Sequence, residues 1–504
     1  MLNNKIKKYI KFSSMMIFVL SSIALAIFNY SQLNDVVFYK NKDAIISGSI
    51  ANKDNVFLIL QNKNSNTNKL RSFKTFLKQN DFSFVSVILD ENGINQEIND
   101  EIDKVFLDNE LNKNFYLATQ GKIKNSLIVD NASYKLNGKI IFEPNKEQEN
   151  ADKETPILLI TTTLSNQSPP ELATEIYNKM TSQTINSTGF AFNSNNGNVT
   201  LNIVSQMHKS YKPMSYEMVE LVQKWINDNF SLNLKYQNFY QFTDALIYLN
   251  LISLAIVFIL TNWYNTFKKM EQTYRIIDLV VVSPIKFLFA RVFVWIISLL
   301  ILAVLSFIAW NIKTIQFDSS LVFALYLFAS GIVMSALYKF GKAPGINGNI
   351  DNKSAIPVGK LAYGKSIVLI LPFLLTFILV EMSGYLYVDY TLKSIITSVV
   401  FMFMIYPGFY IFERENAILN EIEVRTVTRN LYKIALFVPL LIIALICIPI
   451  GYTTWLYTSY VQIIALVLVI LLGNAIKDIT DSIFFSSTIQ AILYGVFLGA
   501  VKLV

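Results

Sequence analysis

The chain has 504 residues, of which 53% are hydrophobic and 16% are charged, and its formal net charge is +7 at pH 7. Charged residues make up about 25% of an average soluble protein, so the composition excludes an ordinary soluble protein, and its apolar content excludes a disordered chain. A single cysteine excludes a disulfide-stapled scaffold. The composition instead favours an integral membrane protein.

Apolar runs long enough to cross a membrane are unevenly distributed along the chain. A helix needs about 20 predominantly apolar residues to cross the hydrocarbon layer. One such run lies near the N-terminus, a long polar segment follows, and the remainder is nearly continuous membrane sequence. The sequence predicts about nine spans, which are Met15–Phe28, Ala245–Leu260, Phe287–Trp310, Leu321–Tyr338, Ile367–Tyr387, Ser394–Phe412, Ile434–Tyr452, Tyr460–Leu472 and Ile483–Val501.

Lysine and arginine residues in the short loops predict the orientation of these spans, because such residues are retained on the cytoplasmic side. Four lysines precede the first span, so the polar segment after it is expected outside the cytoplasm. The basic loops that follow alternate with loops poor in lysine and arginine. The positive net charge therefore reflects loop orientation, and we expect the lipid bilayer and no nucleic acid as a partner.

Three parts of the chain follow from this pattern. Residues 1–30 form a basic cytoplasmic start and a membrane anchor, residues 40–232 form an extracytoplasmic domain, and residues 243–504 form a multi-span, all-α membrane domain. The protein is thus expected in the cell membrane as a multi-pass protein. The first apolar run leaves two interpretations open, because Ala24-Leu25-Ala26 is typical of a signal-peptide cleavage site while Ile27 and Phe28 continue the apolar run. We favour the uncleaved anchor.

Residues 40–232 alternate between short β-branched runs and amphipathic stretches. Repeated strand–helix units of this kind are typical of a mostly parallel sheet with helices on both faces. The predicted strands are Ile45–Ile50, Asn55–Leu60, Phe82–Leu89, Asn114–Ala118, Lys139–Phe142, Pro156–Ile160 and Asn198–Val204. The predicted helices are Lys69–Gln79, Gln96–Leu111, a helix that Pro169 and Pro170 open, and Ser215–Asn229.

The order of these elements resembles the α/β-hydrolase fold over nearly the whole segment. Ile45–Ile50 is similar to an early strand of that fold, and Thr155–Ile160 with the helix after it is similar to the strand, acid loop and helix of its second half. Asn202–His208 is similar to the strand and loop that present the catalytic histidine. The resemblance implies that His208, the only histidine in the chain, descends from a catalytic one.

Most of the catalytic elements of that family are altered in this chain. The family's nucleophile is a serine in a G-x-S-x-G turn, and the matching pentapeptide, Leu117-Ala-Thr-Gln-Gly121, has Thr119 at the serine position. The acid loop Thr161–Ser168 contains no carboxylate, so Glu143 after the preceding strand is the available substitute. The resemblance therefore implies Thr119, His208 and Glu143 as an aberrant or vestigial triad, and it supports the fold more than the activity.

Other chemistry has little support in the sequence. The chain lacks a Walker-A loop, a G-x-G-x-x-G loop, an H-E-x-x-H motif and paired cysteines. We therefore expect no cofactor, no metal and no ATPase activity of its own.

Two charged residues lie inside the predicted membrane spans. Glu381 is the acidic residue well inside a span, and such residues often mark a pathway or a binding site, although its neighbours also fit a position near the outer surface. Arg291 is expected to extend its charged group to a membrane surface. The segment Lys269–Lys286, before the next span, also resembles the cytoplasmic connector of type-2 ABC exporter permeases.

Three functions remain open from the sequence. The first is a pseudo-hydrolase whose external domain binds a lipid, peptide or cell-envelope ligand without turnover. The second is an active membrane-bound esterase or lipase relative with the triad Thr119, His208 and Glu143. The third is a transport permease that needs a separate partner ATPase.

Overall fold

The computed structural model comprises two compact units. We call Met1–Ile23, Leu246–Glu381 and Val388–Leu503 the helical unit, and Ala24–Ala245 with Met382–Tyr387 the α/β unit. The structure describes residues 4–32, 35–41, 43–62, 70–89, 93–111, 114–120, 136–146, 155–162, 168–185, 191–194, 197–204, 216–235, 240–269, 280–281, 291–304, 319–339, 346–347, 360–383, 386–388, 391–421, 438–439, 442, 453–480 and 482–502.

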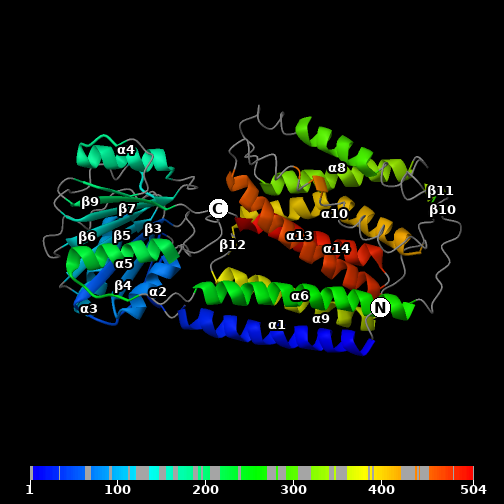
Figure 1. Ribbon diagram of the computed structural model, residues 1–504, viewed down its shortest axis with the longest axis horizontal. Helices are drawn as coiled ribbons and strands as arrows, with labels where there is room; N and C mark the ends of the chain where they lie inside the picture. Colours follow the sequence, from blue (N-terminus) through cyan, green and yellow to red (C-terminus); the bar gives the residue numbers. More distant parts are fainter. Residues whose placement is uncertain are drawn as a thin grey trace. The chain divides into compact units, whose positions relative to one another are not determined.

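A mostly parallel sheet forms the centre of the α/β unit (Figure 1). Its nine strands run in the order β1-β2-β4-β3-β5-β6-β7-β9-β8. The six from β4 to β9 in this order are mutually parallel, whereas β1 and β2 at one edge and β8 at the other pair in antiparallel fashion. The strands are β1 Val36–Lys40, β2 Ala44–Ser49, β3 Asn55–Asn62, β4 Ser83–Leu89, β5 Asn114–Gln120, β6 Leu136–Phe142, β7 Ile157–Thr162, β8 Ala191–Asn193 and β9 Val199–Val204.

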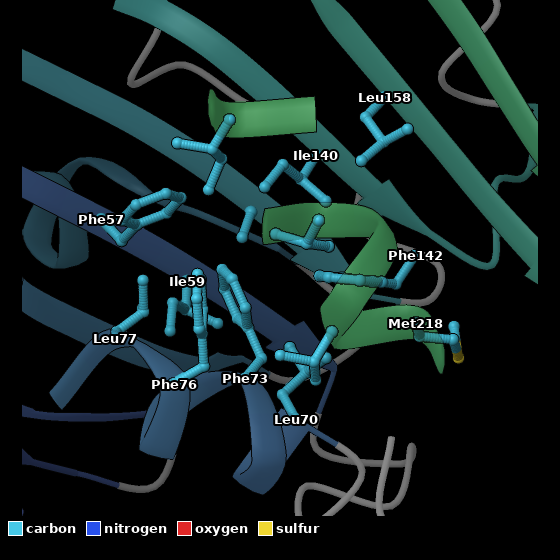
Figure 2. Packing of buried hydrophobic residues seen from close by; sticks show 14 of the residues in the cluster. Phe57, Ile59, Leu70, Phe73, Phe76, Leu77, Ile140, Phe142, Leu158 and Met218 are labelled. Carbon is cyan, nitrogen blue, oxygen red and sulfur yellow. The ribbon is translucent and has the colours of Figure 1, made fainter. Parts of the chain in front are cut away.

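Helices cover both faces of this sheet, because alternate strand residues point to opposite faces and both sets are apolar. One face packs against α2 (Arg71–Gln79) and α5 (Tyr216–Phe230), and the other packs against α3 (Gln96–Asp108) and α4 (Pro170–Thr181). Figure 2 shows the first core, where the Phe73 ring of α2 packs edge-on against Phe57 of β3 and Phe76 lies beside Phe73. The predicted two-faced α/β architecture is confirmed.

Local sequence signals explain where two of these helices begin. The side chain of Asn95 accepts a hydrogen bond from the backbone N–H of Ile98, which caps the otherwise unpaired first turn of α3. Pro170 occupies the first helical position of α4, where the N–H that proline lacks would have no intrahelical partner. Both helices begin close to the positions that the sequence predicts.

Long apolar helices supply nearly all of the helical unit, and a few residues at the ends of three of them belong to the α/β unit. Seven helices in the described part of the chain contain segments long and apolar enough to cross a membrane, as is typical of multi-pass membrane proteins. The helices are α1 Asn4–Gln32, α6 Tyr240–Lys269, α8 Ser319–Lys339, α9 Lys360–Met382, α10 Leu392–Glu421, α13 Thr453–Thr480 and α14 Ile483–Ala500.

Two of the nine predicted spans are not among these seven. The described part of the predicted span Phe287–Trp310 is a shorter apolar helix, Arg291–Val304, and the predicted span Ile434–Tyr452 lies almost wholly outside the described residues.

Glycines allow three of these helices to approach one another closely. A Cβ on Gly331 of α8 would lie 2.5 Å from the backbone N of Gly408 in α10, and a Cβ on Gly408 would lie 2.6 Å from the carbonyl oxygen of Leu327. On another side of α10, a Cβ on Gly499 of α14 would lie 2.4 Å from the backbone N of Ser398. Small residues at helix crossings are the usual packing device in membranes, where lipid supplies no hydrophobic drive between helices.

Asn250 of α6 connects three helices of the helical unit. Its amide nitrogen donates to the hydroxyls of Ser21 and Ser22 in α1 at 3.1 and 2.7 Å, and its amide oxygen accepts from Thr376 of α9 at 2.8 Å. All four side chains are buried. Ser21 and Ser22, which interrupt the apolar sequence of α1, therefore face α6.

Candidate functional site

The carboxyl ends of parallel strands meet at one edge of a sheet, which is where α/β proteins commonly place their ligand sites. We call the ends of β4, β3, β5, β6 and β7 the carboxyl edge. Thr119 lies near the end of β5, and Glu143 directly follows β6. The structure thus brings two of the three predicted triad residues to adjacent strand ends. His208 lies outside the described residues.

Thr119 lies within the strand and not on a turn after it. Its Cα pairs with Leu60 of β3 on one side and with Ile141 of β6 on the other, and the residue is 8% exposed. The nucleophile of an α/β-hydrolase, in contrast, lies on a sharp, strained strand-to-helix turn. Thr119 lacks such strain, because it is not among the described non-glycine residues with positive φ.

Glu143 does have a strained backbone. Its φ is 55°, in the left-handed region that non-glycine residues seldom adopt. Its backbone N–H donates to the carbonyl oxygen of Ile160 in β7 at 2.8 Å, and the residue is 8% exposed. The hydrogen bond to β7 therefore holds the buried Glu143 at the carboxyl edge, in a backbone conformation that is about 1–2 kcal/mol less favourable than the right-handed one.

Three polar residues form a hydrogen-bonded row, which we call the amide row, across three adjacent strands of the same edge. The Gln61 side chain of β3 donates to that of Gln120 in β5 at 2.9 Å, and Ser86 of β4 donates to Gln61 at 3.4 Å. Each residue is at most 1% exposed. The sheet alternation places the row on the face that α2 and α5 cover. Its amides are uncharged donors and acceptors that pair with each other inside the sheet core, and they supply no nucleophile.

Lys74, on the helix α2 that covers the amide row's face of the sheet, has a strongly lowered pKa. Lys74 lies on α2, and its ammonium is 5.9 Å from the centroid of the Phe84 ring. Burial lowers the pKa of Lys74 from 10.5 to about 8, and the nearby positive charge of Lys78 contributes in the same direction while Asp35 opposes it. A substantial fraction of Lys74 is therefore uncharged at pH 8.

Buried charges also lie in the helical unit, and of these the sequence singled out only Arg291. Arg291 contacts both carboxylate oxygens of Glu415 at 3.0 Å, and the two side chains are 4% and 0% exposed. The expectation that Arg291 extends to a membrane surface is therefore wrong for this structure, because its guanidinium is paired inside the helical unit. Glu381, the other charged residue that the sequence singled out, is only partly buried near the end of α9.

A second ion pair is centred on Glu413 of α10. Lys477 of α13 donates to the Glu413 carbonyl oxygen at 2.9 Å and lies 3.4 Å from its carboxylate Oε2. Gln490 of α14 donates from Nε2 to Oε1 of the same carboxylate at 2.8 Å. Sequence reasoning missed these residues because Glu413 and Glu415 were assigned to a loop beyond the span. The signal that was available is Gln490, the one amide side chain in a helix of apolar and hydroxyl-bearing residues.

Comparisons with known proteins give no family for this chain. No protein-family model matches it, and comparisons with curated proteins and with solved structures return no significant match. Within the described ranges, no group of three or more His, Cys, Asp or Glu side chains could hold a metal ion.

Proposed function

We propose that this chain is a multi-pass membrane protein whose α/β unit is a non-catalytic, pseudo-hydrolase binding module. The observation that carries the proposal is the position of Thr119. Its backbone is part of a ladder with strands on both sides and its residue is 8% exposed, whereas covalent catalysis needs a nucleophile presented to substrate beside a base.

The amide row supports the absence of turnover. Gln61 and Gln120 are uncharged, hydrogen-bonded to each other and located where parallel strands end. They contribute no general base, and their exposure of at most 1% keeps them inside the sheet core. We propose a lipid, a peptide or an envelope polymer as the ligand, bound outside the cytoplasm by residues 40–232 of a cell-membrane protein.

Hydrolysis by the purified full-length protein tests this proposal. The protein is incubated with a panel of carboxylic esters of different acyl length, and Thr119→Ala and His208→Ala are assayed beside it, with Thr75→Ala on the outer part of α2 as a matched control. We expect equal background rates for all four proteins. Turnover by the parent and the control that both triad variants lose would instead establish the active-hydrolase alternative.

A second candidate function, a transport permease, is favoured by the buried charges of the helical unit. Charged side chains within membrane helices are costly and are characteristic of transport proteins. The connector-like segment Lys269–Lys286 lies almost wholly outside the described residues. Co-purification of a separate ATP-binding subunit, with ATPase activity that depends on this chain, would support the permease, and its absence from gently solubilised membranes would count against it.

A further inference from the structure

α10 carries two buried ion pairs that attach it to two different structural neighbours. Glu413 pairs with Lys477 of α13, and Glu415 pairs with Arg291 of the Arg291–Val304 helix. Successive residues of an α-helix are rotated by about 100°, so side chains two apart point in nearly opposite directions. The C-terminal part of α10 is therefore held from both sides.

The pair at Glu413 is reinforced by a third helix. Gln490 of α14 donates to its carboxylate, and the Gln490 side chain lies directly on Gly473 of α13, where a Cβ would come within 1.7 Å of the amide nitrogen. α13 and α14 thus present Lys477 and Gln490 together to a single carboxylate. Since Glu413 and Glu415 are both 0% exposed, separating either from its partner would leave a buried charge uncompensated.

A helix-breaking dipeptide precedes these ion pairs. Pro407 lies inside α10, where its ring removes one backbone hydrogen bond, and Gly408 follows it. The backbone of α8 approaches α10 at this same dipeptide, because a Cβ on Gly331 would lie 2.5 Å from the Pro407 carbonyl carbon. The helix thus lacks a backbone hydrogen bond at the place where it is packed against α8, and a pivot needs both features.

We propose that the C-terminal part of α10, from Phe409 to Glu421, is a hinged segment that pivots at Pro407-Gly408 and is latched by the Arg291–Glu415 and Lys477–Glu413 ion pairs. Glu415 lies eight residues from the pivot, which is about 12 Å of helix. A rotation of about 15° moves it by about 3 Å, enough to separate Glu415 from Arg291. Because the two partners lie on opposite sides of α10, the pivoting motion that opens both pairs runs across the line joining Arg291 and Lys477, so that both ion pairs lengthen together. Two discrete states follow, one with both pairs closed and one with both open. This inference does not depend on the function of the α/β unit.

Hydrogen exchange of the full-length protein in lipid nanodiscs tests the latch. Glu415→Gln and Lys477→Met each remove one charge from the latch. We expect amides 409–421 to exchange at least about tenfold faster in each variant, because a buried charge loses its opposite charge, while amides 392–406 stay within about twofold of the parent. Lys393→Gln, which removes an exposed charge from the other end of α10, is the matched control and is expected to change neither segment.

Two further variants separate a hinge from general destabilisation. The exchanged pair Arg291→Glu with Glu415→Arg is expected to restore slow exchange in 409–421. Pro407→Ala, which returns a backbone hydrogen bond at the pivot, is expected to slow exchange in 409–421 in the otherwise unchanged protein. Equal acceleration of 392–406 and 409–421 in the charge variants, or unchanged exchange in Pro407→Ala, would overturn the proposal.

Discussion

Replacing Gly408 by alanine should separate α8 from α10. The added Cβ would lie 2.6 Å from the carbonyl oxygen of Leu327, whereas ordinary van der Waals contact begins at 3.4 Å. The helices must therefore move apart by about 0.8 Å at their closest point, because the contacted atom belongs to backbone and cannot rotate away. Overpacking of this kind costs about 1–3 kcal/mol. Gly331→Ala, which faces the same crossing, should cost a similar amount.

Reversible denaturation of the detergent-solubilised protein measures this cost. Gly364→Ala is the matched control, since a Cβ at that helical position of α9 meets nothing within 4 Å. It should be neutral or stabilise by up to about 1 kcal/mol, because alanine has the higher helix propensity. If Gly408→Ala and Gly364→Ala had the same free energy of unfolding, the close crossing of α8 and α10 would be wrong.

Three other predictions concern single side chains. Competitive labelling of Lys74 with an amine-reactive reagent should reach half its maximum near pH 8, and a midpoint near 10.5 would contradict this. Because the pKa of Lys74 in the folded protein lies below the unfolded value of 10.5, Lys74→Met should stabilise the protein most below pH 8 and progressively less toward pH 10.5. Asn250→Leu should lower the free energy of unfolding in detergent by about 2 kcal/mol, since the interhelical hydrogen bonds to Ser21, Ser22 and Thr376 are lost at about 0.6 kcal/mol each on average. An unchanged stability would show that these bonds do not form. Phe57→Ala should lower the free energy of unfolding of the α/β unit by about 3–5 kcal/mol, because Phe57 is 0% exposed among the Phe73, Phe82 and Tyr116 rings. Leu107→Ala, at a side chain that is 72% exposed, should change it by less than about 0.5 kcal/mol, and equal effects of the two substitutions would refute the packing.

The sequence predicted the interior of the α/β unit well because burial on both faces leaves a clear pattern. Continuous apolar runs such as Asn55–Leu60 correspond to parallel strands covered by helices, and β3 extends that run only to Asn62. The edge strands were missed for the opposite reason. β1 has Val36 and Val37 more than half exposed, and β8 has only three residues, so neither has a pattern of burial that a sequence could reveal.

The polar interactions of the protein were less predictable, because partners distant in sequence determine them. The sequence placed Thr119 and Glu143 near the same sheet edge, but only the strand register shows Thr119 within a ladder. Likewise, Arg291 and Glu415 are 124 residues apart and each alone is typical of a helix end. Hydropathy could locate the helices but not the ion pairs that join them.

Covalent labelling of Thr119 is the most direct test of the pseudo-hydrolase proposal. The full-length protein is treated with a fluorophosphonate, a reagent that modifies activated hydroxyl nucleophiles, and the peptide containing Thr119 is examined by mass spectrometry. We expect no adduct on Thr119 in the parent protein. An adduct on Thr119 that disappears in His208→Ala would contradict the proposal and would show that an activated nucleophile exists at the carboxyl edge.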